Sequence, residues 1–134
     1  MAAADYDNDG RPDLAVSAVG EPVGLLRNTT ETRHHWISLE IIGDGKASNR
    51  NAIGAAVKIE AGGRSRQFWI AGGGSFLSAS DRRLLVGLGN VDRADRVTVR
   101  FPSGRVQVYS GLKAGRWWRL VEGVDAAQDG RPKQ

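Results

Sequence analysis

The residues of this sequence that could do chemistry are concentrated near its beginning, in the acidic segment 5–13. A glycine that can turn the chain sharply stands at position 10, among aspartates at alternating positions. Two carboxylates held ~4 Å apart repel each other by about 1 kcal/mol even in water, so a cation is expected among them. Calcium suits such a loop because it binds about six to eight oxygen atoms in flexible geometry. We therefore predict a calcium site formed by the side chains of Asp5, Asp7, Asp9 and Asp13 and the main-chain carbonyl of Arg11.

The spacing of segment 5–13 begins like that of an EF-hand loop, but the rest of the pattern differs. An EF-hand loop has a bidentate glutamate at its twelfth position and lies between two helices. The twelfth position here is Val16, and the flanking segment 14–19 is predicted to be a strand. The alternative to a metal site is a solvated turn, which Asp, Asn and Gly also favour. A short calcium loop is the interpretation that we prefer.

Composition limits the class of protein. The chain has 134 residues, of which 40% are hydrophobic and 25% charged, as in an ordinary globular domain. The absence of cysteine excludes a cysteine-based zinc site. A net charge of +4 is too small to indicate nucleic acid, and no apolar run is long enough for a membrane helix. We expect neither a nucleic-acid partner nor a membrane span. We also expect the natural chain to extend upstream of Met1.

The rest of the chain has the pattern of short strands joined by turns. Glycine clusters separate short apolar runs, and Ile37, Leu39 and Ile41 alternate with polar residues in segment 36–42. By the same alternation we expect Val106 and Val108 to face the core. The predicted strands are 14–19, 23–27, 36–42, 53–61, 64–71, 84–88, 96–101, 105–109 and 117–121.

These segments predict an all-β protein. We expect an antiparallel β-sandwich or flattened barrel over 34–123, because such packing buries one face of each strand. Residues 1–33 form a separate N-terminal unit with the calcium loop and one hairpin. Residues 124–134 are expected to be a disordered tail.

The segment from Asp5 to Asn28 resembles the closing part of an FG-GAP or VCBS-type repeat, the calcium-loop unit of integrin-like β-propellers. Its residues 5–14, Asp-Tyr-Asp-Asn-Asp-Gly-Arg-Pro-Asp-Leu, match that loop almost position for position. Because a single repeat cannot close a propeller, the resemblance implies a hairpin left from a last blade whose fellows lie upstream.

The following residues resemble the ASPIC/UnbV domain, which in larger proteins follows such repeats. The resemblance implies a non-enzymatic, secreted or surface-associated module. It implies no particular ligand, and an association with enediyne biosynthesis leaves a small-molecule role open. Phe76, Ala79 and Phe101 stand where the family often has Tyr, Gln and Trp. The matching segments are 48–55 (Ser-Asn-Arg-Asn-Ala-Ile-Gly-Ala), 74–78 (Gly-Ser-Phe-Leu-Ser), 87–89 (Gly-Leu-Gly) and 97–104 (Val-Thr-Val-Arg-Phe-Pro-Ser-Gly).

Two further groups of residues could bind a ligand. Asn49, Arg50 and Asn51 offer amide and guanidinium donors, although Asn also makes turns with its own backbone, which we prefer here. Trp69, Trp117 and Trp118 could stack on sugars, although tryptophan is more often largely buried.

Catalytic residues are harder to find. The adjacent histidines 34 and 35 would point to opposite faces of a strand and could not easily share a metal. No nucleophile motif is present, but Glu40, Glu60 and Glu122 could meet in space. We expect a protein that is not an enzyme.

The function expected is a calcium-binding recognition or adhesion module of an exported, extracellular or cell-surface protein. The alternatives are a carbohydrate-binding module that uses exposed tryptophan, and an accessory protein of natural-product biosynthesis. The partner is a protein or glycan that the sequence does not identify. An exposed edge strand of the N-terminal unit could also form a homodimer.

Overall fold

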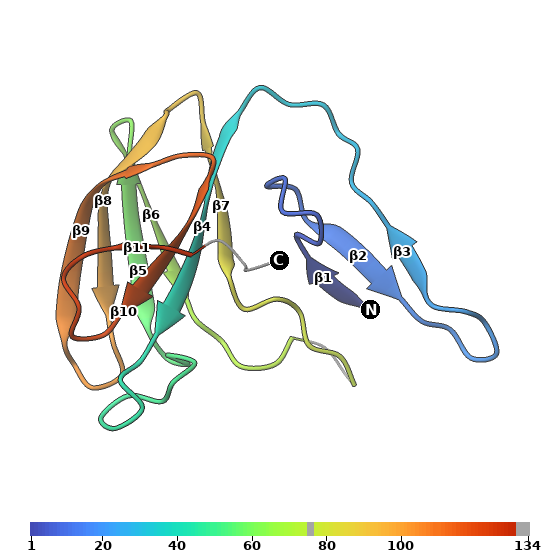
Figure 1. Ribbon diagram of the computed structural model, residues 1–134, viewed down its shortest axis with the longest axis horizontal. Coiled ribbons are helices and arrows are strands. Elements are labelled where there is room, and N and C mark those ends of the chain that lie inside the picture. The colour runs from blue at the N-terminus through green and yellow to red at the C-terminus, as the bar shows by residue number, and fades with distance from the viewer. Residues whose placement is uncertain (75–76, 131–134) are drawn as a thin grey trace.

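The computed structural model describes residues 1–74 and 77–130, which form eleven strands and no helix (Figure 1). None of these residues therefore belongs to a helix that could cross a membrane. The strands are β1 (Ala2–Ala4), β2 (Asp13–Val16), β3 (Gly24–Leu26), β4 (His35–Ile42), β5 (Ala56–Ala61), β6 (Arg64–Trp69), β7 (Leu84–Gly89), β8 (Arg93–Arg100), β9 (Val106–Lys113), β10 (Arg116–Val121) and β11 (Gln128–Asp129).

Two four-stranded sheets form a β-sandwich. One has the order β11-β10-β4-β7 and the other β6-β5-β8-β9. The inner faces of both sheets supply one hydrophobic core, in which Ile37, Leu39, Val57, Val97 and Leu120 are fully buried. The predicted all-β fold is confirmed, and of the two predicted forms the structure has the sandwich.

The predicted antiparallel pairing is wrong for one pair of strands. β10 runs parallel to β4, with Arg116 opposite Ile37 and Val121 opposite Ile42. Before β10 the chain crosses from one sheet to the other, and Gly115 N donates to Trp36 O at 2.7 Å. β10 therefore begins beside the beginning of β4 and runs in the same direction, which makes this sheet mixed.

The predicted inward face is correct for β4 but wrong for β9. Val106 and Val108 are about half exposed, whereas Gln107 and Tyr109 are buried. The cause is the register of β9, which places Tyr109 opposite Val97 and Gln107 opposite Val99. Residues directly opposite each other share a face of the sheet, so the buried positions of β8 determine those of β9.

The N-terminal unit is a three-stranded sheet with the order β1-β2-β3, one strand more than the predicted hairpin. It lies beside the sandwich, on the side of β4 and β7 (Figure 1). The segment before β7 covers the free edge of β1: Asp81 N donates to Ala3 O at 2.9 Å, and Ala3 N donates to Ser80 Oγ at 3.2 Å. β3 forms the opposite edge of this sheet.

The expected tail 124–134 is not disordered over its described part, residues 124–130. Gln128–Asp129 form β11 against Trp118 and Arg119 of β10, and Gly130 N donates to Trp117 O at 2.9 Å. The remaining tail residues, 131–134, lie outside the described residues.

A buried carboxylate joins three loops at one end of the sandwich. Glu122 accepts hydrogen bonds from Ser103 Oγ and, at 3.1 Å, from Asp44 N, while Ser48 Oγ accepts one from Ser103 N at 3.1 Å. Burial acts to raise the pKa of Glu122, but the hydrogen bonds from Ser103, Ser48 and Asp44 outweigh it and leave the pKa below 4.5, its ordinary value. The charged form of Glu122 therefore stabilises the fold.

The lowered pKa of Glu122 predicts a pH dependence of stability. Because the folded pKa lies below the unfolded one, the stabilisation is present above about pH 4.5 and is lost as the pH falls through the folded pKa. We expect Glu122→Gln to lower the free energy of unfolding at pH 7 by about 1–3 kcal/mol and to flatten its decline in acid. Urea unfolding at a series of pH values measures both effects. Glu60→Gln, at the surface pair with Lys58, is the control. An equally steep acid decline in Glu122→Gln would contradict this role.

Candidate metal centre

The acidic loop joins β1 to β2, and the pairing of these strands brings its two ends together. Ala4 lies opposite Asp13, so Asp5 and Asp13 stand at the same end of the sheet. Both carboxylates are buried and organise the loop backbone. Asp5 accepts hydrogen bonds from the amides of Asp9 and Gly10, both at 2.9 Å. Asp13 accepts them from the amides of Tyr6 at 2.9 Å and Asn28 at 2.7 Å.

Three carboxylates converge at this point. Asp5, Asp7 and Asp13 each place one oxygen atom within 4.8 Å of the other two. Calcium binds oxygen at about 2.3–2.6 Å, so two ligands on opposite sides of one ion lie roughly 5 Å apart. The oxygen spacing and the hard, anionic character of these donors therefore fit a single calcium ion.

The other two predicted ligands make different contacts. The Asp9 carboxylate accepts hydrogen bonds from the Arg11 amide, at 2.9 Å, and from the Arg11 guanidinium. Arg11 Nε also donates to Asn28 O at 2.9 Å. Arg27 Nε lies 2.6 Å from Asp7 Oδ2 and so offsets part of the negative charge of the cluster. That Asp9 and the Arg11 carbonyl bind metal stays a prediction.

The two buried carboxylates differ in their pKa. Burial raises the pKa of Asp5, and the amide hydrogen bonds from Gly10 and Asp9 only partly oppose it. The amide hydrogen bonds from Asn28 and Tyr6 lower the pKa of Asp13. Asp13 is therefore the more stable anion, whereas a bound cation would favour the charged form of Asp5.

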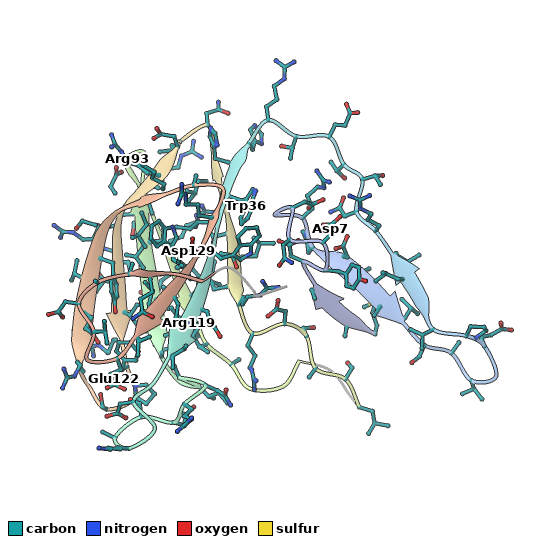
Figure 2. All side chains as sticks on the ribbon, viewed as in Figure 1. Asp7, Trp36, Arg93, Arg119, Glu122 and Asp129 are labelled. Carbon is teal, nitrogen blue, oxygen red and sulfur yellow. The ribbon has the colours of Figure 1, made fainter. Side chains whose placement is uncertain are left out.

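The loop lies directly against the sandwich. Gly10 has a φ angle of +88°, and a Cβ atom built on it would lie 2.1 Å from Cε2 of Trp36, on β4. Trp36 in turn contacts Trp117 on β10 edge to face, with ring centroids 5.0 Å apart. Figure 2 shows Trp36 between the sandwich and the loop that carries Asp7. Arg83 adds a polar link, with Nη1 donating to Asn8 Oδ1 at 2.9 Å and Nη2 to Asp5 O at 3.3 Å.

The three predicted ligand residues in segment 49–51 lie on the surface. The Asn49 side chain exchanges two hydrogen bonds of 2.9 Å with the backbone of Ile53, as in the preferred turn interpretation. Arg50 packs against Gly45. Arg50 and Asn51 also line a cavity of about 490 Å³, together with residues 79–83.

The three candidate tryptophans lie in different surroundings. Trp69 is 67% exposed on the outer face of β6. Trp118 packs against the core, and its Nε1 donates to Lys113 O at 3.0 Å. Trp117 is half-buried, and its Nε1 is buried without a hydrogen-bond partner among the described residues. Trp69 is therefore the one of the three that offers an open ring to a ligand.

The three glutamates considered for catalysis take part in separate interactions. Glu40 pairs with Arg119 at 2.8 Å, Glu60 pairs with Lys58 at 3.0 Å, and Glu122 belongs to the loop network described above. His34 is exposed near the beginning of β4 and lines a different cavity from Glu40.

Comparison with protein families identifies both parts of the chain. Residues 45–127 match the model of the ASPIC and UnbV family. The chain belongs to this family. Residues 1–30 match the model of the FG-GAP repeat, in the order that the sequence resemblance predicted. The comparison with curated proteins gives no match. FG-GAP repeats generally bind calcium, and both families usually occur in extracellular or surface proteins. Together they indicate a recognition or adhesion-type module.

The three positions that differ from the usual family pattern have different surroundings. Phe101 is buried in the core at 2% exposure, and Ala79 lines the cavity beside Arg50. Phe76 and its neighbour Ser75 lie outside the described residues.

Sequence reasoning missed Trp36 and Arg83 as residues of this site. Trp36 begins a strand with clear alternation, so its outward position was predictable, but its contact with Gly10 joins residues that are distant in the chain. Arg83 is one of many arginines, and nothing in its local sequence distinguishes it.

The Gly10–Trp36 contact predicts that Gly10→Ala displaces the loop. The substitution combines a left-handed backbone, which costs roughly 1–3 kcal/mol, with a collision against a rigid indole. We expect a lower melting temperature and a changed tryptophan fluorescence spectrum. Gly20→Ala is the matched control, because Gly20 has a φ angle of +79° but open space around it. Equal effects of the two substitutions would contradict a specific docking of the loop on Trp36.

Proposed function

We propose that this protein is a calcium-stabilised, non-enzymatic recognition module of an exported, extracellular or cell-surface protein. The observation that carries the proposal is the convergence of Asp5, Asp7 and Asp13 in a loop that packs on Trp36. Calcium bound there would brace the loop and do no chemistry. The FG-GAP match and the usual location of both families support this reading.

Bracing the loop would stabilise the whole chain, because the loop contacts the sandwich through Trp36 and Arg83. A ligand that binds only the folded state stabilises it by about 2.7 kcal/mol at a hundredfold excess over its Kd. A typical domain has a total stability of roughly 5–15 kcal/mol, so this gain is a large part of it.

The ligand set is tested by two substitutions that remove the same charge from the same loop. Asp7→Asn removes a carboxylate of the converging cluster, whereas Asp9→Asn removes one that pairs with Arg11. We expect calcium to raise the melting temperature of the wild type and a chelator to reverse the rise. Asp7→Asn should weaken calcium binding about tenfold or more, and Asp9→Asn should weaken it less. Calorimetric titration gives both affinities.

Two outcomes of these measurements would contradict the proposed calcium site. A melting temperature that ignores both calcium and chelator would refute the structural ion. A larger loss of affinity in Asp9→Asn than in Asp7→Asn would show that Asp9 contributes more to the site than Asp7 and would contradict the convergence of Asp5, Asp7 and Asp13 as its basis.

A second candidate function is glycan binding at Trp69. This indole is exposed on the outer face of the β6-β5-β8-β9 sheet, where a shallow groove of about 370 Å³ is also lined by Lys58, Gln67, Thr98 and Arg100. An open indole beside polar side chains suits stacking on a sugar ring. A glycan array separates the two candidates, since Trp69→Ala should abolish glycan binding without altering calcium affinity.

The non-enzymatic assignment and the homodimer remain proposals. The cavity that contains Glu40 and Asp81 supports the former, because Arg119 and Arg83 already pair with these carboxylates. Activity towards a natural product would overturn the non-enzymatic assignment.

Exposed Leu25 and Leu26 at the β3 edge support the proposed homodimer. Sedimentation of a monomer at high concentration would refute the homodimer.

A further inference from the structure

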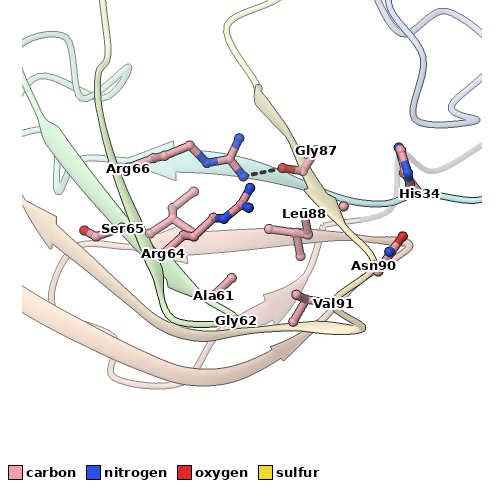
Figure 3. A pocket seen from close by; sticks show the side chains of 12 residues that line it. His34, Ala61, Gly62, Arg64, Ser65, Arg66, Gly87, Leu88, Asn90 and Val91 are labelled. Atoms are coloured by element: carbon pink, nitrogen blue, oxygen red, sulfur yellow. Dashed lines mark hydrogen bonds between the residues drawn. The ribbon is translucent and has the colours of Figure 1, made fainter.

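A cavity of about 790 Å³ opens where the two sheets of the sandwich separate, between the edge strands β6 and β7 (Figure 3). The buried side chains of Ile59 and Leu88 lie at its floor. Arg64, Arg66 and His34 lie around it, and none of the described residues that line it is acidic. The cavity therefore combines apolar walls with two guanidinium groups.

The alternation of β6 directs both arginines to the inner side of the sheet. Phe68 lies opposite Val57 and packs against the core. Two and four residues earlier, Arg66 lies opposite Ile59 and Arg64 opposite Ala61. Successive side chains on one face of a strand have a period of two, so both guanidinium groups stand where the core would otherwise continue. Figure 3 shows both side chains reaching towards β7.

The two arginines have little negative charge to balance them. Arg66 donates a hydrogen bond to the carbonyl of Gly87, and neither arginine has an ion pair within the described part of the chain. Like charges this close in sequence on one face of a strand repel each other, so an anion between them would be stabilised.

Inward-pointing charges on an edge strand can also serve to prevent edge-to-edge aggregation. Such a guarding role requires no cavity, whereas here there is space in front of both arginines. On β7, a Cβ atom built on Gly87 or Gly89 would meet no heavy atom within 4 Å. Because Arg66 donates a hydrogen bond to the carbonyl of Gly87, this carbonyl is not available to pair with an additional strand at the β7 edge. A small ligand fits these observations better than a peptide that extends the sheet.

We propose that this cavity binds a small organic anion that has an apolar body. Its carboxylate, sulfate or phosphate group would accept hydrogen bonds from Arg64 and Arg66, whose planar guanidinium groups match such oxyanions. Its apolar body would lie against Ile59 and Leu88. The volume lies within the range of about 300–1,000 Å³ that is usual for small-ligand sites.

The test is an NMR titration of the full chain in the presence of calcium, in which the backbone amide resonances are followed. The two probes added are naphthalene-2-sulfonate and 2-naphthoate. We expect saturable binding of one probe molecule per chain, with the largest shifts at Gly62, Gly87, Gly89 and Asn90. Two control compounds should each bind at least about tenfold more weakly than these probes. Neutral naphthalene-2-sulfonamide lacks the charge, and inorganic sulfate lacks the apolar body. Comparing the two anionic probes distinguishes a sulfonate from a carboxylate as the preferred group.

The double variant Arg64→Gln/Arg66→Gln should weaken binding of the anionic probes about tenfold or more. Arg96→Gln/Arg116→Gln is the matched control, since it removes the same charge from exposed positions of β8 and β10 that line neither this cavity nor the Trp69 groove, and it should leave the affinity unchanged. The amide chemical-shift changes of the wild-type chain locate the binding site even if a variant fails to fold. Unchanged affinity in the first variant, shifts centred elsewhere, or no saturable binding of either anion at millimolar concentration would overturn the proposal.

Discussion

The mutual repulsion of three carboxylates is the constraint on which the N-terminal unit depends. Asp5 and Asp13 are held together by the β1–β2 pairing and by four amide hydrogen bonds, and Asp7 completes the cluster. Arg27 and Arg83 offset part of the charge from outside. A hard cation at the centre would offset it most directly, because each oxygen could then contact positive charge at its shortest distance.

The acidic loop is joined to the sandwich by a rigid contact with Trp36 as well as by the hydrogen bonds of Arg83. Gly10 allows the loop to approach Trp36 so closely that any side chain there would collide with the indole. Trp36 packs on Trp117, so the loop, β4 and β10 form one continuous stack of contacts. A three-stranded sheet with exposed leucines has little core of its own. The folding of this small sheet therefore depends on two contacts with the rest of the chain. One is made by the acidic loop, and the other by the segment that covers the free edge of β1.

Local pattern predicted much of this structure, and long-range pairing accounts for the rest. The alternation of Ile37, Leu39 and Ile41 was sufficient to place β4 and its buried face. The same reasoning failed at Val106 and Val108, because the register against β8 decides which face of β9 is buried. The spacing of aspartates predicted the loop, but not that Asp9 would pair with Arg11. Local sequence does not reveal that Arg64 and Arg66 border a cavity, since that depends on the gap between two sheets.

We expect calcium binding in the acidic loop to be coupled to the sandwich through Trp36. Two-dimensional NMR during a calcium titration tests it directly, by following the amides of Asp9 and Gly10 together with the indole N–H groups. The Trp36 indole resonance should shift in step with the loop amides, while that of Trp69, which is exposed on the opposite sheet, should stay in place. Loop amides that do not respond to millimolar calcium would contradict calcium binding at this site, and a Trp36 resonance that stays fixed while the loop amides shift would contradict its coupling to the sandwich.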